Sequence, residues 1–225
     1  EVTGTIDESI RHAVTKFAHI HFPASSDAEN RIIKLGERPD MVFKVGCPRI
    51  DLVAEILHKR VDVEHHIAKF GVGAEINLSK PFVLVSQHPV TTEYGEGERQ
   101  IFETLTAVKN SGLQAIVLWP NSDAGAEDIS RGYRKLRENT DLENMRFFKN
   151  LPIDCYIKLM QETSCLVGNS SSGIREGAFI GTPVVNIGSR QFSRERGLNV
   201  MDVDHDADHI GRALSAQVRH GLYEM

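Results

Sequence analysis

The sequence predicts an α/β fold in which a Rossmann-like parallel sheet carries helices on both faces. From Pro81 onward, short apolar runs of four to six residues alternate regularly with longer helical patterns, as in sheets that are buried on both sides. Polar residues also follow several of these runs directly, where a parallel sheet presents the carboxyl ends of its strands. We therefore expect a ligand site at that edge of the sheet.

The first part of the chain, up to about residue 48, has a different pattern. Apolar side chains recur on one helical face after Asp7 and Glu8, which suit the first turn of a helix. Helices are expected at residues 7–16 and 26–36, and short strands at 18–25 and 41–48. These elements are too few to close a sheet of their own.

The rest of the chain predicts a regular alternation of strands and helices. Each apolar run is short enough for a buried strand, and each intervening segment is long enough for a helix. The expected strands are 82–88, 115–120, 146–151, 165–169, 183–188 and 199–203. The expected helices are 96–110, 125–138, 153–163, 173–180 and 206–219, with one or two more within 50–80.

Composition excludes several classes of function. The 225 residues suffice for one sizeable domain, and a formal charge of −5 argues against general binding to nucleic acid or to anionic membranes. No apolar stretch approaches the roughly 20 residues that span a bilayer. The chain has three cysteines without CxxC spacing and shows no signal peptide, so reduced thiols and a cytoplasmic location are expected. The missing initiator methionine indicates a piece of a longer protein.

Polar residues follow four of the expected strands, at the edge where ligands of such sheets bind. His88 stands at the end of the first of them, and Asn121 and Asp123 follow the next. Asn150 stands near the end of the third, and the run Gly-Asn-Ser-Ser-Ser-Gly at 168–173 begins where the fourth ends. Because the four loops converge on one edge, together they predict a site.

The serine run favours a phosphate. Small residues let an anion approach backbone N–H groups at the start of a helix, and serine hydroxyls add donors. The alternative is that these residues only cap the helix. Glu176, one turn further on, either accepts bonds from ribose hydroxyls, as acidic residues of dinucleotide folds do, or completes a cap. On balance a nucleotide is the expected ligand.

Other site motifs are absent from the sequence, which contains no GxGxxG, no GxxxxGK[ST] and no HExxH. The acidic run at 202–209 resembles a calcium loop, but Ala207 and Ala213 stand where such a loop needs Gly and Glu. A solvated loop with a helix cap is the preferred interpretation. No metal and no cofactor are expected.

Four ordered blocks carry a resemblance to a known family: GTIDESIRHAVTKFAH, SQHPVTT, PNSDAG and GNSSSGIREGAFIGTPVVNIGSRQ. They resemble the hydrolysing UDP-N-acetylglucosamine 2-epimerases of sialic and nonulosonic acid biosynthesis. The resemblance implies a glycosyltransferase-B type fold of two Rossmann-like domains. Residues 1–48 would be the tail of the N-terminal domain, and 49–225 the UDP-binding C-terminal domain. The family's Gly-Asp-Arg and His-x-Glu-Gly-Gly blocks would lie upstream of this chain, which would be truncated at its N-terminus.

The resemblance also implies roles for individual residues. Asp7 would be an active-site carboxylate, with Glu8 as the second choice, and His88 would contact the UDP-sugar near the diphosphate and assist catalysis. The other residues would bind UDP: Asn121, Ser170 and Ser171 its phosphates, Glu176 its ribose, the backbone of Leu151 its uracil, and Arg190 would add positive charge.

The implied reaction is an elimination that releases UDP and leaves a glycal, followed by addition of water to give N-acetylmannosamine. Four alternatives stay open: a non-hydrolysing epimerase, a hydrolysing enzyme for a diacetamido-trideoxy UDP-sugar, a glycosyltransferase, and a non-catalytic nucleotide-binding fragment. The absence of a kinase segment favours a bacterial enzyme. Relatives of this kind are usually homo-oligomers, so a homo-oligomer is expected for the full-length protein.

Overall fold

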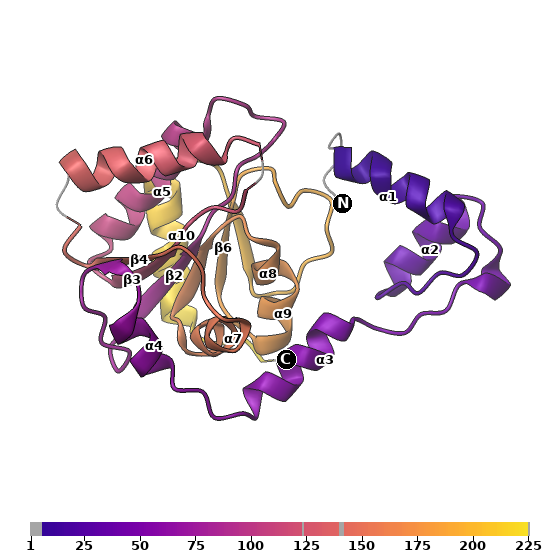
Figure 1. Ribbon diagram of the computed structural model, residues 1–225, viewed down its shortest axis with the longest axis horizontal. Helices are drawn as coiled ribbons and strands as arrows, with labels where there is room; N and C mark the ends of the chain where they lie inside the picture. Colours follow the sequence, from indigo (N-terminus) through magenta and orange to yellow (C-terminus); the bar gives the residue numbers. More distant parts are fainter. Residues whose placement is uncertain (1–5, 123, 140–141, 225) are drawn as a thin grey trace.

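The computed structural model describes residues 6–122, 124–139 and 142–224 and has the expected α/β fold (Figure 1). Among these residues, seven strands form one sheet in the order β1-β4-β3-β2-β5-β6-β7. The strands are β1 (Val72–Gly73), β2 (Phe82–Ser86), β3 (Gln114–Leu118), β4 (Met145–Phe148), β5 (Cys165–Gly168), β6 (Val184–Ile187) and β7 (Val200–Val203). The six strands predicted from Pro81 onward are confirmed.

The central strands pair in parallel, which brings their carboxyl ends together. β2 pairs with β3 and β5, and Ser86 at its end lies opposite Leu118 and Gly168. Only β1 runs antiparallel, along β4. The sequence did not predict β1, because two residues are too few for a hydrophobic period. Gly73 permits the pairing, since a Cβ there would lie 2.4 Å from a backbone oxygen of β4.

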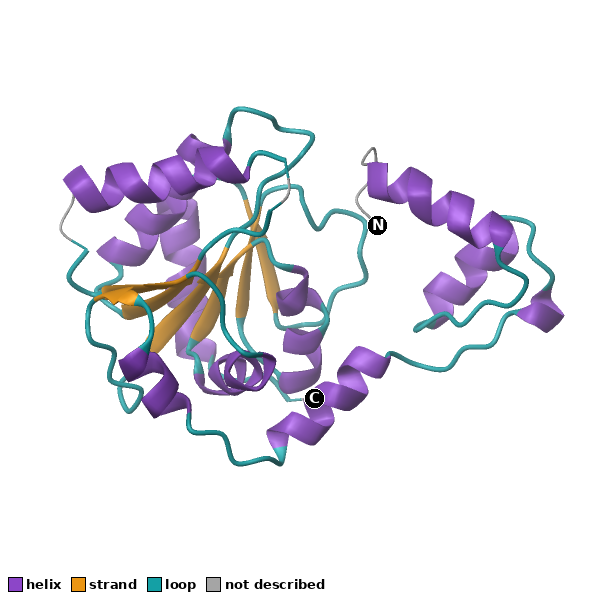
Figure 2. Ribbon diagram, viewed as in Figure 1, coloured by secondary structure: helices purple, strands orange, loops and turns teal. Residues whose placement is uncertain are grey.

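Helices cover both faces of the sheet (Figure 2). Val83 and Val85 of β2 pack with residues of α5, α6 and α10 on one face, whereas Phe82 and Leu84 pack with residues of α3, α4, α7 and α9 on the other. The bounds are α3 (Pro48–Leu57), α4 (Val63–Lys69), α5 (Gly97–Asn110), α6 (Ala126–Asn139), α7 (Ile153–Glu162), α8 (Ser171–Ile174), α9 (Glu176–Ile180) and α10 (Ala207–His220). Because β2 is covered on both faces, all five of its residues are buried.

The N-terminal segment holds α1 (Ile6–Phe17), α2 (Ser26–Lys34) and the 3-10 turn η1 (Pro39–Met41), and projects to one side of the sheet (Figure 1). The two strands expected at 18–25 and 41–48 are wrong. Only one isolated parallel bridge joins His21 to Val42. Pro23 lacks the N–H needed to extend the ladder, and η1 occupies the approach to the second segment.

The helix expected at 173–180 is interrupted. It begins earlier, at Ser171, and divides into α8 and α9 at Arg175, whose φ and ψ are −100° and −70°. α8 has only four residues, so its dipole is weak. Binding of an anion at this turn therefore depends more on hydroxyls and nearby cations, and less on the helix dipole, than the sequence predicted.

The three cysteines are free thiols, and two of them, Cys155 and Cys165, are buried. Burial raises the pKa of the Cys165 thiol to about 12, which makes it a poor nucleophile. Within the described residues, no helix combines the length and the apolar character needed to cross a membrane.

Candidate functional site

A cavity of about 460 Å³ lies at the carboxyl ends of four neighbouring strands. Its walls come from α3, from α7 and from the loops after β2, β3, β4 and β5, which are the four loops predicted from the sequence to form a site. The lining side chains are Arg49, Ser86, His88, Leu118, Trp119, Pro120, Asn121, Lys149, Asn150, Leu151, Ile153, Tyr156, Ser170, Ser171, Ser172, Arg175 and Glu176.

The cavity brings together six of the residues chosen from the sequence: His88, Asn121, Leu151, Ser170, Ser171 and Glu176. Arg190 is not in its lining and instead donates from Nη1 to the carbonyl oxygen of Asn169 at 3.3 Å. Asp7 belongs to α1, but its side chain lies outside the described residues, as does Asp123. Glu8 is half-buried in α1 and is likewise not in this lining.

Asn169 fixes the backbone of the His88 loop. Its Oδ1 accepts from the His88 N–H at 2.7 Å, and its Nδ2 donates to the His88 carbonyl at 2.8 Å. Asn169 is fully buried, and Gln191 Nε2 donates to its carbonyl at 2.7 Å. The loops after β2 and β5 are therefore locked to one another beneath the cavity.

The hydrogen bonds of the His88 ring define its tautomer. Nδ1 accepts the backbone N–H of Asn121 at 3.2 Å, so the proton of the neutral ring resides on Nε2. Nε2 lies 3.4 Å from Ser86 Oγ. His88 can thus offer an N–H donor while it holds the loop after β3.

The serine turn is organised by a chain of hydroxyls. Tyr156 Oη lies 2.6 Å from Ser172 Oγ, which lies 2.9 Å from Ser170 Oγ. Ser170 also caps α8 through its side chain. Burial raises the pKa of Tyr156, so its hydroxyl stays neutral. The cap interpretation and the donor interpretation of the serines are therefore compatible, because both use the same turn.

Three cations line the cavity around this turn: Arg49, Lys149 and Arg175. Lys149 and Arg175 are exposed, so they remain hydrated until a ligand enters. Together with the serine hydroxyls of the same lining, they make the cavity suited to an anion such as a diphosphate.

Glu176 forms an ion pair rather than a helix cap. Arg49 Nε donates to its Oε1 at 2.9 Å, and Arg175 Nε lies 3.7 Å from its Oε2. The side chain of Glu176 is only 2% exposed. Within the described part of the chain, Oε2 is buried without a hydrogen-bond partner, so this residue of the cavity lining has one strong acceptor that the protein does not use.

Sequence reasoning missed Arg49 and Tyr156. Arg49 is 127 positions from Glu176 and stands in a segment without a motif, so no spacing could reveal the pair. Tyr156 lies in an amphipathic helical pattern, where an aromatic residue suggests core packing. For Asn169 the sequence held a weak indication of a role in the site, because this residue stands directly between the apolar run and the serines.

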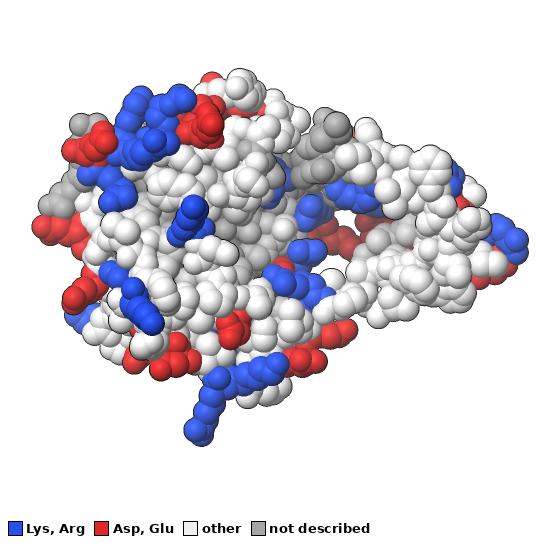
Figure 3. Space-filling view, in the orientation of Figure 1, with Lys and Arg blue, Asp and Glu red and all other residues white. Residues whose placement is uncertain are grey.

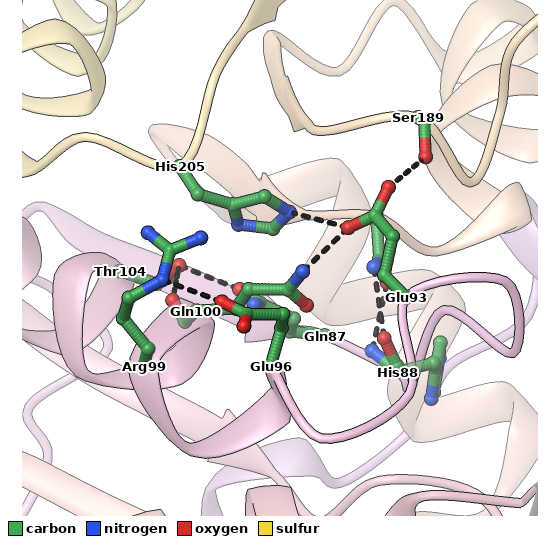
Figure 4. A network of polar contacts seen from close by, with 10 residues as sticks. Gln87, His88, Glu93, Glu96, Arg99, Gln100, Thr104, Ser189 and His205 are labelled. Atoms are coloured by element: carbon green, nitrogen blue, oxygen red, sulfur yellow. Dashed lines mark hydrogen bonds and ion pairs between the residues drawn. The ribbon is translucent and has the colours of Figure 1, made fainter.

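A polar network holds the loop that follows His88 (Figure 4). Glu93 accepts from Gln100 Nε2 at 2.5 Å and from the Ser189 hydroxyl, and its Oε2 lies 4.0 Å from His205 Nε2. The loop after β2 is thereby tied to the loops after β6 and β7. This network lies outside the cavity lining and supports the position of His88.

A second, larger cavity of about 870 Å³ lies between α1, α2 and the body of the sheet. Figure 3 shows Lys and Arg side chains gathered around the hollow at this place. Arg175 lines both cavities, so a ligand in the first could extend toward the second. The hollow is bridged by Ser25, whose hydroxyl lies 2.6 Å from Glu195 Oε2.

The acidic run at 202–209 contains a helix cap, as expected. Asp206 caps α10 by accepting from the His209 N–H at 2.8 Å. In the part of the chain that the structure describes, no group of three or more His, Cys, Asp or Glu side chains is arranged to hold a metal ion.

The comparisons with known proteins agree on one family. The family model described as UDP-N-acetylglucosamine 2-epimerase matches residues 1–224. The chain is 36% identical over 210 residues to the UDP-N,N'-diacetylbacillosamine 2-epimerase (hydrolyzing) of Legionella pneumophila, covering 93% of this chain and 53% of that protein. It is 29% identical over 225 residues to the UDP-N-acetylglucosamine 2-epimerase of Neisseria meningitidis, covering 100% and 56%. The chain thus spans about half the length of these relatives.

Solved structures share the fold. A UDP-GlcNAc 2-epimerase from Neisseria meningitidis, crystallised with UDP-GlcNAc, superposes with a TM-score of 0.72 at 15% identity, over 96% of this chain and 57% of that one. The enzyme from Methanocaldococcus jannaschii gives 0.68 at 13% identity, over 96% and 59%. The chain therefore has the expected α/β fold and corresponds to about half of a glycosyltransferase-B type protein.

Proposed function

The chain belongs to the UDP-N-acetylglucosamine 2-epimerase family, and on that premise we propose that it carries the UDP-binding half of a hydrolysing UDP-sugar 2-epimerase. The activity belongs to the whole protein, of which this chain corresponds in length to about half. Residues 49–225 would form the UDP-binding domain, and residues 1–48 the tail of the preceding domain. In support of this division, the strands of the sheet begin only at Val72.

One observation carries the proposal. Six residues chosen from the sequence as nucleotide ligands line a single cavity, together with three cations. The serine hydroxyls, Lys149 and Arg175 would stabilise the diphosphate, both when the substrate binds and when UDP leaves. Glu176 would accept from the ribose, and the Leu151 backbone would meet the uracil. The N–H of Leu151 already donates to Asn150 Oδ1 at 2.9 Å, which leaves its carbonyl for such a contact.

His88 would act near the reacting diphosphate. With its proton on Nε2, a neutral ring can donate to a phosphate oxygen and stabilise the charge that develops on the leaving group. Asp7, or Glu8 beside it, would supply the carboxylate for proton transfer at the sugar. Arg190 would act indirectly, since its guanidinium supports the Asn169 backbone.

The hydrolysing subtype is supported by two relatives that are hydrolysing epimerases, from Legionella pneumophila and from Campylobacter jejuni at 30% identity. Both act on a diacetylbacillosamine nucleotide, so a diacetamido-trideoxy UDP-sugar is a specific alternative to UDP-N-acetylglucosamine. A cytoplasmic location, expected from the sequence, is part of the same proposal. We expect the whole protein to be a homo-oligomer.

Two experiments test the proposal. Titration calorimetry of the chain with UDP should give binding between about 1 μM and 1 mM, weakened in both Ser171→Ala and Glu176→Ala. The protein expressed from its whole gene should then convert a UDP-sugar into free sugar and UDP. Recovery of an intact epimerised UDP-sugar would instead identify a non-hydrolysing enzyme, and a folded chain without affinity for UDP would refute the site.

A further inference from the structure

The first turn of α3 is tied to the cavity by one side chain. Arg49 stands there, and α3 packs against α9 (Figure 1), so its guanidinium reaches the first residue of α9, Glu176. The hydrogen bond from Nε to Oε1 is 2.9 Å long. The Arg49 side chain is 40% exposed and that of Glu176 is 2% exposed, so the pair has one buried member.

A carboxylate this buried requires a positive partner, because burial of an unpaired charge is strongly unfavourable. Two guanidinium groups stand near Glu176, but only Arg49 forms a hydrogen bond; Arg175 Nε lies 3.7 Å away. Arg49 therefore fixes Oε1 and with it the plane of the carboxylate. The other oxygen, Oε2, is left buried and, as far as the described residues go, accepts no hydrogen bond.

We propose that Arg49 is a positioning residue for nucleotide binding, one that acts through Glu176. By holding Oε1, it keeps Oε2 oriented to accept a ribose hydroxyl of the bound nucleotide. This rests on the proposed function, which supplies a UDP-sugar as the ligand. Without Arg49 the carboxylate turns toward Arg175, and the acceptor that the ribose needs is used within the protein.

This role differs in its consequences from two simpler ones. If Arg49 served only as a cation for the diphosphate, its loss would lower the affinity for every uridine diphosphate equally, whatever substituent the ribose carries at its 2′ position. If it served only to join α3 to α9, its loss would lower the melting temperature without a selective effect on ligands. Only a residue that acts through the ribose acceptor changes the preference for the 2′-hydroxyl.

The experiment measures the affinities of the 225-residue chain for UDP and for 2′-deoxy-UDP by calorimetry. Wild type should prefer UDP by at least about tenfold, the contribution of one hydrogen bond to a charged acceptor. Arg49→Gln should reduce this preference to about twofold or less, with the affinity for 2′-deoxy-UDP within about threefold of wild type. Arg49→Lys, which retains the charge, should recover part of the preference.

A double variant protects the test against a folding defect, since Arg49→Gln alone leaves the Glu176 carboxylate short of a partner. Arg49→Gln/Glu176→Gln has no buried charge to compensate, and it should bind both nucleotides as Glu176→Gln does. Weaker binding of 2′-deoxy-UDP by the double variant than by Glu176→Gln would overturn the inference, as would an unchanged preference in Arg49→Gln. Both results would leave the proposed function intact, whereas a folded wild type that fails to bind UDP would overturn both.

Discussion

Tyr156 and Ser172 are joined by a hydrogen bond of 2.6 Å between Oη and Oγ. This contact connects α7, on one face of the sheet, to the serine turn that follows β5. Ser172 Oγ in turn lies 2.9 Å from Ser170 Oγ. The orientation of Ser170 at the cavity therefore depends on the Tyr156 hydroxyl of α7. Because burial raises the pKa of Tyr156, this hydroxyl keeps its proton at neutral pH.

Tyr156→Phe removes this hydroxyl without changing the ring. The variant should lose about 0.5–1.5 kcal/mol of stability, the net contribution of one hydrogen bond, and its affinity for UDP should fall by roughly 3- to 10-fold as the serine turn loses its order. Urea unfolding and calorimetry measure the two effects. Tyr94→Phe is the matched control, because Tyr94 is 81% exposed. Unchanged affinity in Tyr156→Phe would refute the role given to the hydroxyl chain.

Asn169 offers a sharper stability test. Asn169→Ala removes both hydrogen bonds to the His88 backbone and leaves a partly buried N–H and C=O unpaired, which should lower the free energy of unfolding by about 1–3 kcal/mol. Exposed Asn110, the last residue of α5, provides a control that should change by less than about 0.5 kcal/mol when replaced by Ala. Equal effects of the two substitutions in urea would contradict the locking of the two loops.

The sheet was predictable because its apolar runs are short and regularly spaced. Strands such as β2 are buried on both faces, so the sequence must supply continuous apolar residues there whatever the loops contain. The N-terminal segment lacked this constraint. Its apolar residues Phe17, Phe22 and Val45 are exposed, and a pattern that suggested strands leads only to the bridge at His21 and Val42.

The candidate site was predictable to the extent that its residues follow strands. His88, Asn121 and Ser170 could be placed at one edge because parallel strands end together. Arg49 could not be placed there, because its contact with Glu176 depends on how α3 packs against α9. Such packing produces no motif of fixed spacing in the sequence. Arg190 was placed near the nucleotide by resemblance alone, whereas in the structure its guanidinium donates to the Asn169 carbonyl.

Gly168 is required by the geometry at the end of β5. Its φ is +134°, and a Cβ there would lie 2.2 Å from the backbone oxygen of Ser86. Gly168→Ala should therefore destabilise the fold by at least about 1–3 kcal/mol, the energy of a strained backbone, and displace the loop before the serines. Gly211→Ala is the opposite case, because nothing lies within 4 Å of its Cβ position inside α10. That change should stabilise the fold by up to about 1 kcal/mol. The melting temperatures of the two variants should therefore move in opposite directions.

The pH dependence of stability should reveal the titration of His205. Burial lowers its pKa below the ordinary value of 6.5, while the charge of Glu93 opposes the shift. In the described structure both ring nitrogens are buried without a hydrogen-bond partner, and Glu93 Oε2 lies 4.0 Å away. The unfolded chain therefore binds a proton at this position at a higher pH than the folded chain does. The stabilising contribution is present above about pH 6.5 and is lost as the pH falls through the folded-state pKa.

The measurement compares urea midpoints between pH 7.5 and pH 5 for the wild type and for His205→Gln, which cannot titrate. The variant should lose less stability on acidification than the wild type. A steeper acid loss in His205→Gln would mean that protonated His205 is stabilised in the fold. Attraction to Glu93 would then outweigh desolvation, and the network that holds the loop after His88 would tighten on acidification instead of loosening.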